Sequence, residues 1–131
     1  MKEIEVVAAI IEKDDTILCV QRGDSKYSYV SHKWEFAGGK VEKGESHEQA
    51  LIREIQEELS LTISVDDLCT TVKHSYPDFS IIMHCYFCRI IGGDMVLHEH
   101  VDSWWLSREE LGGLDWAAAD VGVVERLVGV W

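Results

Sequence analysis

A capped amphipathic stretch at residues 46–59 places three glutamates on one side of a predicted helix. Its first four residues, Ser46-His47-Glu48-Gln49, have the pattern of a capping box, in which the first and fourth side chains bond each other's backbone N–H groups. Glu54, Glu57 and Glu58 follow at i, i+3 and i+4, so they share one stripe of the helix. A chain with this segment must provide another layer against which the apolar side of the helix packs.

The three carboxylates predict a bound divalent cation. Like charges on one stripe destabilise a bare helix, so a cation is expected to offset them. Hard oxygen ligands suit Mg²⁺, with Mn²⁺ as a substitute. The preceding residues 38–45 include three glycines, whose backbone can approach a ligand or metal closely. Arg53 stands four residues before Glu57, where it can pair with that carboxylate and hold its rotamer.

The rest of the chain predicts strands on both sides of this helix. Strands are expected at residues 3–11, 16–22, 62–65, 68–75, 79–91, 94–97 and 101–106, with a hairpin turn at residues 92–93. A short capped helix is expected from Ser107 and a final helix at residues 120–128, while residues 23–33 predict a loop near the site. Mixed strands with helices at two places favour an α/β/α sandwich, of the α/β or α+β class.

Composition limits the partners that such a chain can have. The 131 residues suit one domain, and the net charge of −12 argues against nucleic-acid polymers and anionic membranes. No apolar run reaches transmembrane length, and the start does not resemble a signal peptide. Four scattered cysteines without a secretory signal predict a reducing, cytoplasmic setting.

Residues 39–61 form a motif of fixed spacing: Gly, five residues, Glu, seven residues, then Arg-Glu-Ile-Gln-Glu-Glu. This string resembles the Nudix box, the signature of the Nudix hydrolases. One defining position departs from it, because Ser60 stands where the box has a glycine that ends the helix in a left-handed conformation. A serine there costs about 1 kcal/mol and removes no ligand. The resemblance implies a single Nudix domain over residues 1–131, an α/β/α sandwich with a mixed curved sheet.

The resemblance also implies where the chemistry takes place. Nudix hydrolases cleave phosphoanhydride bonds with Mg²⁺, and the implied ligands are the three box glutamates, the backbone carbonyl of Gly38 and an acidic residue of a later loop. By its position, Glu99 is that later residue. Glu54 and Glu99 are competing hypotheses for the general base, with Arg53 supporting the box carboxylates. Arg22 matches a phosphate-contacting arginine of MutT-like members, although an ordinary exposed strand end explains it as well.

Residues 34–42, the opening strand and the segments around residues 98–100 and 118–120 resemble MutT-like enzymes of the CTP pyrophosphohydrolase branch. The resemblance implies the reaction NTP + H₂O → NMP + PPi on a small nucleotide, with cytidine or modified pyrimidine (deoxy)nucleotides preferred. The alternative is a MutT-like 8-oxo-dGTP diphosphatase, a house-cleaning enzyme allied to DNA repair. A third reading, of another class, is a Nudix module that senses nucleotide without cleaving it, and the intact carboxylate triplet argues against it.

Three residues are the candidates for recognition of the nucleobase. Asp120 falls where the oxidised-guanine branch has an asparagine. An ionised Asp120 only accepts hydrogen bonds, which favours an exocyclic amine such as cytosine N4, whereas a buried, protonated one also donates. Capping of the last helix explains Asp120 equally well. Phe36 and Phe79 can stack on a base, and both also suit a hydrophobic core.

Two other signals favour structural readings. Cys85 and Cys88 have C-x-x-C spacing, but residues three apart on a strand point to opposite faces, so core positions are expected. His98 and His100 share a face if extended, yet they lack a third partner for a metal. A monomer and a homodimer are both compatible with the sequence.

Overall fold

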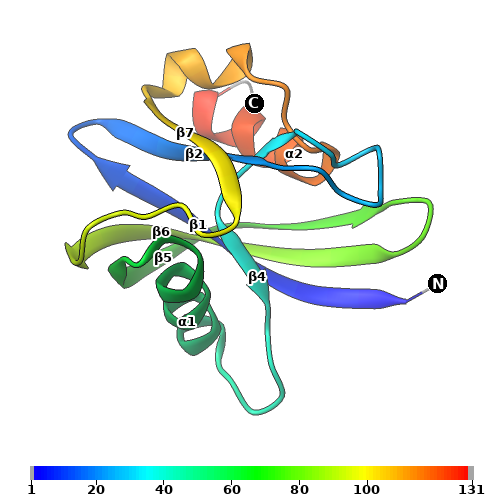
Figure 1. Ribbon diagram of the computed structural model, residues 1–131, viewed down its shortest axis with the longest axis horizontal. Coiled ribbons are helices and arrows are strands. Elements are labelled where there is room, and N and C mark those ends of the chain that lie inside the picture. The colour runs from blue at the N-terminus through cyan, green and yellow to red at the C-terminus, as the bar shows by residue number, and fades with distance from the viewer. Residues whose placement is uncertain (1, 130–131) are drawn as a thin grey trace.

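The computed structural model describes residues 2–129, which form a seven-stranded mixed sheet with helices on both sides (Figure 1). The sheet path is β3-β2-β1-β6-β5, with β4 paired to β1 and β7 paired to β2. In chain order the elements are β1 (Glu3–Lys13), β2 (Thr16–Arg22), β3 (Trp34–Glu35), β4 (Gly38–Lys40), α1 (His47–Leu59), β5 (Thr62–Ser75), β6 (Ser80–Gly92), β7 (His100–Leu106), the 3₁₀ helix η1 (Arg108–Gly113) and α2 (Ala118–Val128). The expected α/β/α sandwich is therefore confirmed.

Strand β1 organises the sheet because it pairs with three other strands. It runs parallel to β6 from Glu3 to Ile11, whereas it pairs with β2 only at its far end, where Asp14 and Asp15 turn the chain with φ of 50° and 63°. Strand β4 adds antiparallel to β1 at residues 6–8. This brings the two glycines of β4 against the middle of β1, which is where the candidate site forms.

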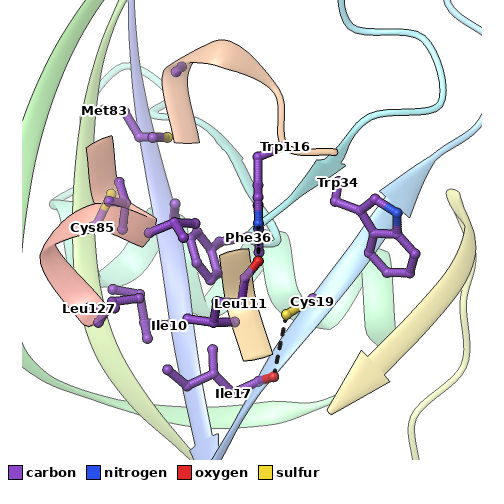
Figure 2. Packing of buried hydrophobic residues seen from close by; sticks show 14 of the residues in the cluster. Ile10, Ile17, Cys19, Trp34, Phe36, Met83, Cys85, Leu111, Trp116 and Leu127 are labelled. Carbon is purple, nitrogen blue, oxygen red and sulfur yellow. Dashed lines mark hydrogen bonds between the residues drawn. The ribbon is translucent and has the colours of Figure 1, made fainter. Parts of the chain in front are cut away.

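Side chains that alternate along the strands build two hydrophobic cores on opposite faces of the sheet. The α2-side core packs β-strand residues such as Ile10 and Met83 against η1 and α2, and Figure 2 shows its centre. The α1-side core packs Val7, Ile11 and other strand residues against α1. Cys85 belongs to the first core and Cys88 to the second. All four cysteines are buried and free, which confirms the structural reading of the C-x-x-C spacing.

Four details of the predicted elements were wrong. Residues 62–75 form one strand rather than two, because a bulge between Val65 and Leu68 absorbs the two aspartates. No strand forms at residues 94–97, where the chain instead crosses the end of α1. The last helix begins at Ala118, two residues early. The short strands β3 and β4 were not predicted, because two or three residues are too few to show a period.

None of the helices formed by residues 2–129 has the length and hydropathy that a membrane crossing requires.

Candidate active site

Helix α1 begins at the predicted capping box. The Gln49 N–H donates to Ser46 Oγ at 3.1 Å, and the Ser46 N–H donates to Gln49 Oε1 at 2.9 Å. Leu51, Ile55 and Leu59 are completely buried against the sheet, and burial of each such side chain stabilises the fold by about 1.5–3 kcal/mol. The cap and the apolar face together fix the rotation of the helix, and with it the direction of its carboxylates.

The three box glutamates differ in exposure although they share one helix. The Glu57 side chain is 57% exposed and that of Glu54 is 14% exposed. Glu58 is buried, and its Oε1 has no hydrogen-bond partner among residues 2–129. Burial, the neighbouring Glu54 carboxylate and further acidic charge raise the pKa of Glu58 to about 9. A buried carboxylate oxygen without a donor is a position that a cation satisfies, so the donor set fits a hard divalent ion.

Arg53 joins this cluster to the segment before the helix. Its guanidinium donates to both carboxylate oxygens of Glu45, at 2.7 and 3.0 Å, and to the Lys40 carbonyl at 3.0 Å. It also donates to Glu54 at 2.7 Å and to Glu57 at 3.3 Å. The predicted pair with Glu57 exists but is the longest of these contacts. Glu45 was not among the predicted site residues, although its fixed place in the motif was the available signal.

The glycines of β4 allow close approach between the strand and the helix. A Cβ added at Gly39 would collide with the Glu54 carboxylate, and one added at Gly38 would collide with the Val7 carbonyl oxygen. A side chain at Gly39 would therefore displace the Glu54 carboxylate, which occupies the space that the missing Cβ leaves.

The far end of α1 is tied to the loop that carries Glu99. Ser60 takes the left-handed conformation expected of the box glycine, with φ 56° and ψ 30°. The N–H groups of Val96 and His98 donate to the carbonyls of Leu59 and Glu58, at 2.9 and 3.0 Å. In this loop Glu99 is exposed, yet its negative charge is close enough to contribute to the raised pKa of Glu58.

The two histidines that flank Glu99 point to different partners. His98 Nε2 lies 2.7 Å from Ser60 Oγ, and His100 Nε2 lies 2.9 Å from the Glu35 carboxylate. They share no site, in agreement with the structural reading of these residues.

A cavity of about 630 Å³ opens on the α2-side face of the sheet, and its lining among residues 2–129 includes no box glutamate. Gly38 and Gly39 line the cavity, and Gly39 lies directly against the Glu54 carboxylate. Four predicted substrate residues line it: Arg22, Phe36, Phe79 and Asp120. The candidate phosphate-binding and base-recognition residues therefore share one cavity with Gly38, whereas the candidate metal-binding glutamates lie outside its lining.

Arg22 lies in this lining as part of a charged chain of three residues. Its Nε donates to Glu35 at 2.7 Å, and the other Glu35 oxygen bonds His100. Although burial opposes ionisation, His100 and Arg22 hold the pKa of Glu35 below its usual range. The Arg22 side chain remains 45% exposed, which leaves part of its guanidinium open to a ligand. Glu35 was missed because nothing in its local sequence indicates a partner 65 residues later.

Asp120 is 4% exposed and accepts a hydrogen bond from the Phe36 N–H at 3.2 Å. Burial and the charge of Glu35 raise its pKa well above the usual range. It is the third residue of α2 and makes no cap, because the N-cap is Ala117 and no side chain caps that end. The capping explanation was therefore wrong, since α2 starts before Asp120 rather than at it.

The two phenylalanines differ in position. Phe36 is 3% exposed and packs in the α2-side core against Trp116, with ring centroids 4.8 Å apart (Figure 2). Phe79 is only half-buried, and its ring lies 5.4 Å from that of Tyr27 and 5.3 Å from that of Tyr76. These three rings form an aromatic wall of the cavity. The tyrosines were not predicted, because they come from a loop and a strand end without periodic pattern.

Comparison with known proteins identifies the family. The sequence model of the NUDIX domain matches residues 1–127. The chain belongs to the Nudix family. It is 39% identical over 130 residues to the CTP pyrophosphohydrolase of Escherichia coli K12, covering 99% of this chain and 95% of that protein. It is 28% identical over 127 residues to the 8-oxo-dGTP diphosphatase of the same organism, covering 97% and 98%.

Solved structures show the same fold. The MutT protein of methicillin-resistant Staphylococcus aureus, a Nudix hydrolase, is 40% identical, with all of both chains covered and a TM-score of 0.75. The protein is accordingly a hydrolase of phosphoanhydride bonds, and its family acts on small nucleotides and generally depends on a divalent metal ion.

Proposed function

We propose that this Nudix hydrolase converts nucleoside triphosphates to the monophosphate and pyrophosphate with Mg²⁺, and that it prefers cytidine or modified pyrimidine nucleotides. The observation that carries the proposal is one cavity lined by Arg22, Asp120 and the two glycines Gly38 and Gly39, of which Gly39 lies directly against the Glu54 carboxylate. Its volume of about 630 Å³ lies in the range of small-ligand sites. Mn²⁺ is the expected substitute for Mg²⁺ because both prefer oxygen ligands.

The metal ligands we propose are Glu54, Glu57, Glu58, Glu99 and the backbone carbonyl of Gly38. When bound, the ion supplies neutralisation of the phosphate charge and activation of water. The partnerless, buried oxygen of Glu58 supports this assignment, because pairing with a cation removes the cost of its burial.

The chain's own residues would divide the remaining work. Arg53 positions Glu54 and Glu57 through one guanidinium, and Arg22 contacts phosphate from the rim of the cavity. Glu54 and Glu99 remain the two hypotheses for the base. Comparing Glu54→Gln with Glu99→Gln separates them, because loss of the base removes the acidic limb of the pH profile of kcat.

In its neutral, protonated form, the Asp120 side chain supports recognition of the nucleobase. Because burial raises its pKa, the carboxyl group retains a proton that can be donated, and it also keeps an acceptor oxygen. A carboxylic acid of this kind matches the N3 acceptor and N4 donor of cytosine. The same group matches the N7–H and O6 of 8-oxoguanine, so 8-oxo-dGTP hydrolysis is the second candidate function. Phe79 and its neighbouring tyrosines would stack on the base, whereas Phe36 contributes its N–H to Asp120.

A pyrophosphate-release screen tests the proposal. It compares CTP, dCTP, 5-methyl-dCTP, dGTP, 8-oxo-dGTP, ATP and UTP in Mg²⁺, with Glu57→Gln as the inactive reference. Preference for the cytidine group supports the proposal, and preference for 8-oxo-dGTP replaces it with the second candidate. If none is hydrolysed, the triphosphate assignment is wrong. If Glu57→Gln weakens nucleotide binding while no hydrolysis occurs in either protein, a sensing module is the correct class.

The state of Asp120 has a test of its own. An asparagine can donate and accept like a protonated carboxyl, so Asp120→Asn should keep kcat/KM for the best substrate within a few fold. Asp120→Ala, which removes both functions, should lower it by about two orders of magnitude. Equal losses in the two variants would contradict the role of Asp120 as a neutral donor and acceptor.

A further inference from the structure

Outside the proposed active site, Glu5, His47 and His84 converge on the α1-side face of the sheet. They come from β1, from the first residue of α1 and from β6. Glu5 Oε2 lies 3.1 Å from His84 Nε2 and 3.4 Å from His47 Nε2. All three potential ligand atoms lie within 4.8 Å of one another. Three segments far apart in sequence thus aim one ligand atom each at the same small volume.

The spacing of these atoms suits a tetrahedral ion. Zinc binds imidazole nitrogen and carboxylate oxygen at about 2.0–2.2 Å, which places neighbouring ligand atoms about 3.4 Å apart. The two distances from Glu5 are close to this value. Two histidines and a glutamate, with a fourth position open, form one of the ligand sets that zinc uses in proteins.

The other nitrogen of each imidazole is also held. His47 Nδ1 lies 2.9 Å from the Tyr86 hydroxyl, and His84 Nδ1 lies 3.0 Å from the Thr71 hydroxyl. A hydrogen on each Nδ1 that donates to these oxygens leaves each Nε2 with a free lone pair directed at Glu5. The two rings are stacked, with centroids 4.1 Å apart, so their orientation is restricted further. This is how proteins orient histidine ligands through their outer contacts.

Access and charge also fit an ion from solvent. The His84 side chain is 16% exposed, that of His47 32% and that of Glu5 49%, so one side of the cluster is open to water. The dipole at the start of α1 disfavours positive charge on His47. The dipole disfavours a protonated His47 imidazole and a bound metal ion alike. The negative charge of the Glu5 carboxylate offsets the dipole whichever of the two is present.

We propose that Glu5, His47 and His84 form a zinc site that is separate from the catalytic metal site. His47 precedes Glu54 by seven residues, which is about 10 Å along the helix axis. Imidazole ligands select zinc over Mg²⁺, whereas the all-oxygen box site selects Mg²⁺. A bound zinc ion fastens the first turn of α1 to β1 and β6, so it stabilises the element that presents the catalytic carboxylates. The competing explanation is that both histidines only donate hydrogen bonds to Glu5.

Zinc titration of tag-free protein in saturating Mg²⁺, without nucleotide, tests the proposal. We expect a single site of micromolar or tighter affinity in the wild-type protein, and at least about tenfold weaker binding in Glu5→Gln and His84→Gln. His74→Gln is the matched control, because His74 lies on β5 outside the cluster, edge-on to Tyr76. Glu57→Gln should keep the zinc affinity, since that variant disturbs only the box site. Equal affinity in wild-type and His84→Gln protein overturns the proposal, as does the absence of zinc binding.

A second measurement does not depend on how the variants fold. Histidine ring resonances of the wild-type protein are followed by NMR while zinc is added. The signals of His47 and His84 should shift together and saturate at one equivalent, while that of His74 stays in place. Shifts spread over all histidines, or absent from these two, contradict the site. Because neither experiment measures hydrolysis, their outcome is independent of the proposed function.

Discussion

The burial of Glu58 predicts a stability that depends on pH when no divalent ion is present. The side chain is 6% exposed, and its pKa is raised from 4.5 to about 9. Above pH 4.5 the unfolded chain releases this proton while the folded protein retains it. The stabilising contribution of the proton is therefore complete below pH 4.5 and is lost progressively as the pH rises towards about 9.

The size of the effect follows from one linked proton. Each pH unit in this window costs about 1.4 kcal/mol of unfolding free energy. Between about pH 6 and pH 8 Glu58 alone lowers stability by up to about 3 kcal/mol, a large part of the 5–15 kcal/mol that holds a typical domain. Glu58→Gln keeps the size of the side chain and removes this dependence. The pKa of Asp120 is also raised, so Asp120 likewise lowers stability as the pH rises. Because Glu58→Gln keeps Asp120, that variant retains this second pH dependence.

Urea unfolding in EDTA at a series of pH values measures this difference. Glu57→Gln is the control, because it makes the same change of side chain at a position that is 57% exposed. The curve of free energy against pH should be shallower in Glu58→Gln than in wild-type or Glu57→Gln protein. Added Mg²⁺ should flatten the wild-type curve, since the ion replaces the proton. Parallel curves for Glu58→Gln and the wild type would refute the reasoning.

Three further substitutions test the site. Gly39→Ala should displace the Glu54 carboxylate and lower kcat by at least about tenfold. Gly112→Ala is the control, because a Cβ added there meets nothing within 4 Å and should leave kcat unchanged. Equal kcat values in the two variants would contradict the argument that Gly39 allows close approach of Glu54. Arg53→Lys removes the guanidinium that donates to several acceptors at once, so the Mg²⁺ affinity should fall about 10–100-fold. The affinity is measured by titrating the activity with Mg²⁺. An unchanged titration would show that Arg53 does not position the metal ligands. Ser60→Gly removes the cost of a left-handed backbone at a serine, but it also loses the hydrogen bond between Ser60 and His98. Stability measured by thermal melting should therefore be unchanged or up to about 1 kcal/mol higher. A large loss of stability would refute the argument that Ser60 ends the helix in a glycine-like conformation.

Features with a local physical cause could be predicted from the sequence. The capping box at Ser46 and the left-handed Ser60 depend on neighbouring residues alone, and both were found as expected. The alternation that separates Cys85 from Cys88 is equally local. The wrong predictions have causes outside the segment. Residues 94–97 include strand-forming side chains, but the Val96 N–H donates to the Leu59 carbonyl at the end of α1 instead of to a second strand.

The site was predictable where the motif fixes the spacing and unpredictable where folding alone brings residues together. Glu54, Glu57 and Glu58 share a helix, so their proximity follows from its period. Glu35 and His100 meet only because β2 pairs with both β3 and β7, a register that no short pattern encodes. The cluster around Glu5 escaped notice for the same reason. The protonation of Asp120 depends on burial, which position in the sequence does not reveal.

The two cores on opposite faces of the sheet separate the support of the carboxylate helix from the lining of the cavity. The carboxylate helix rests on one core, whereas Ile81, Met83 and Ala119, which line the cavity, belong to the other. A gene duplicate could therefore exchange these cavity residues without disturbing the helix on the far side. For directed evolution, a library of substitutions can be confined to the α2-side face of the sheet. Most of its members would keep the carboxylate helix intact.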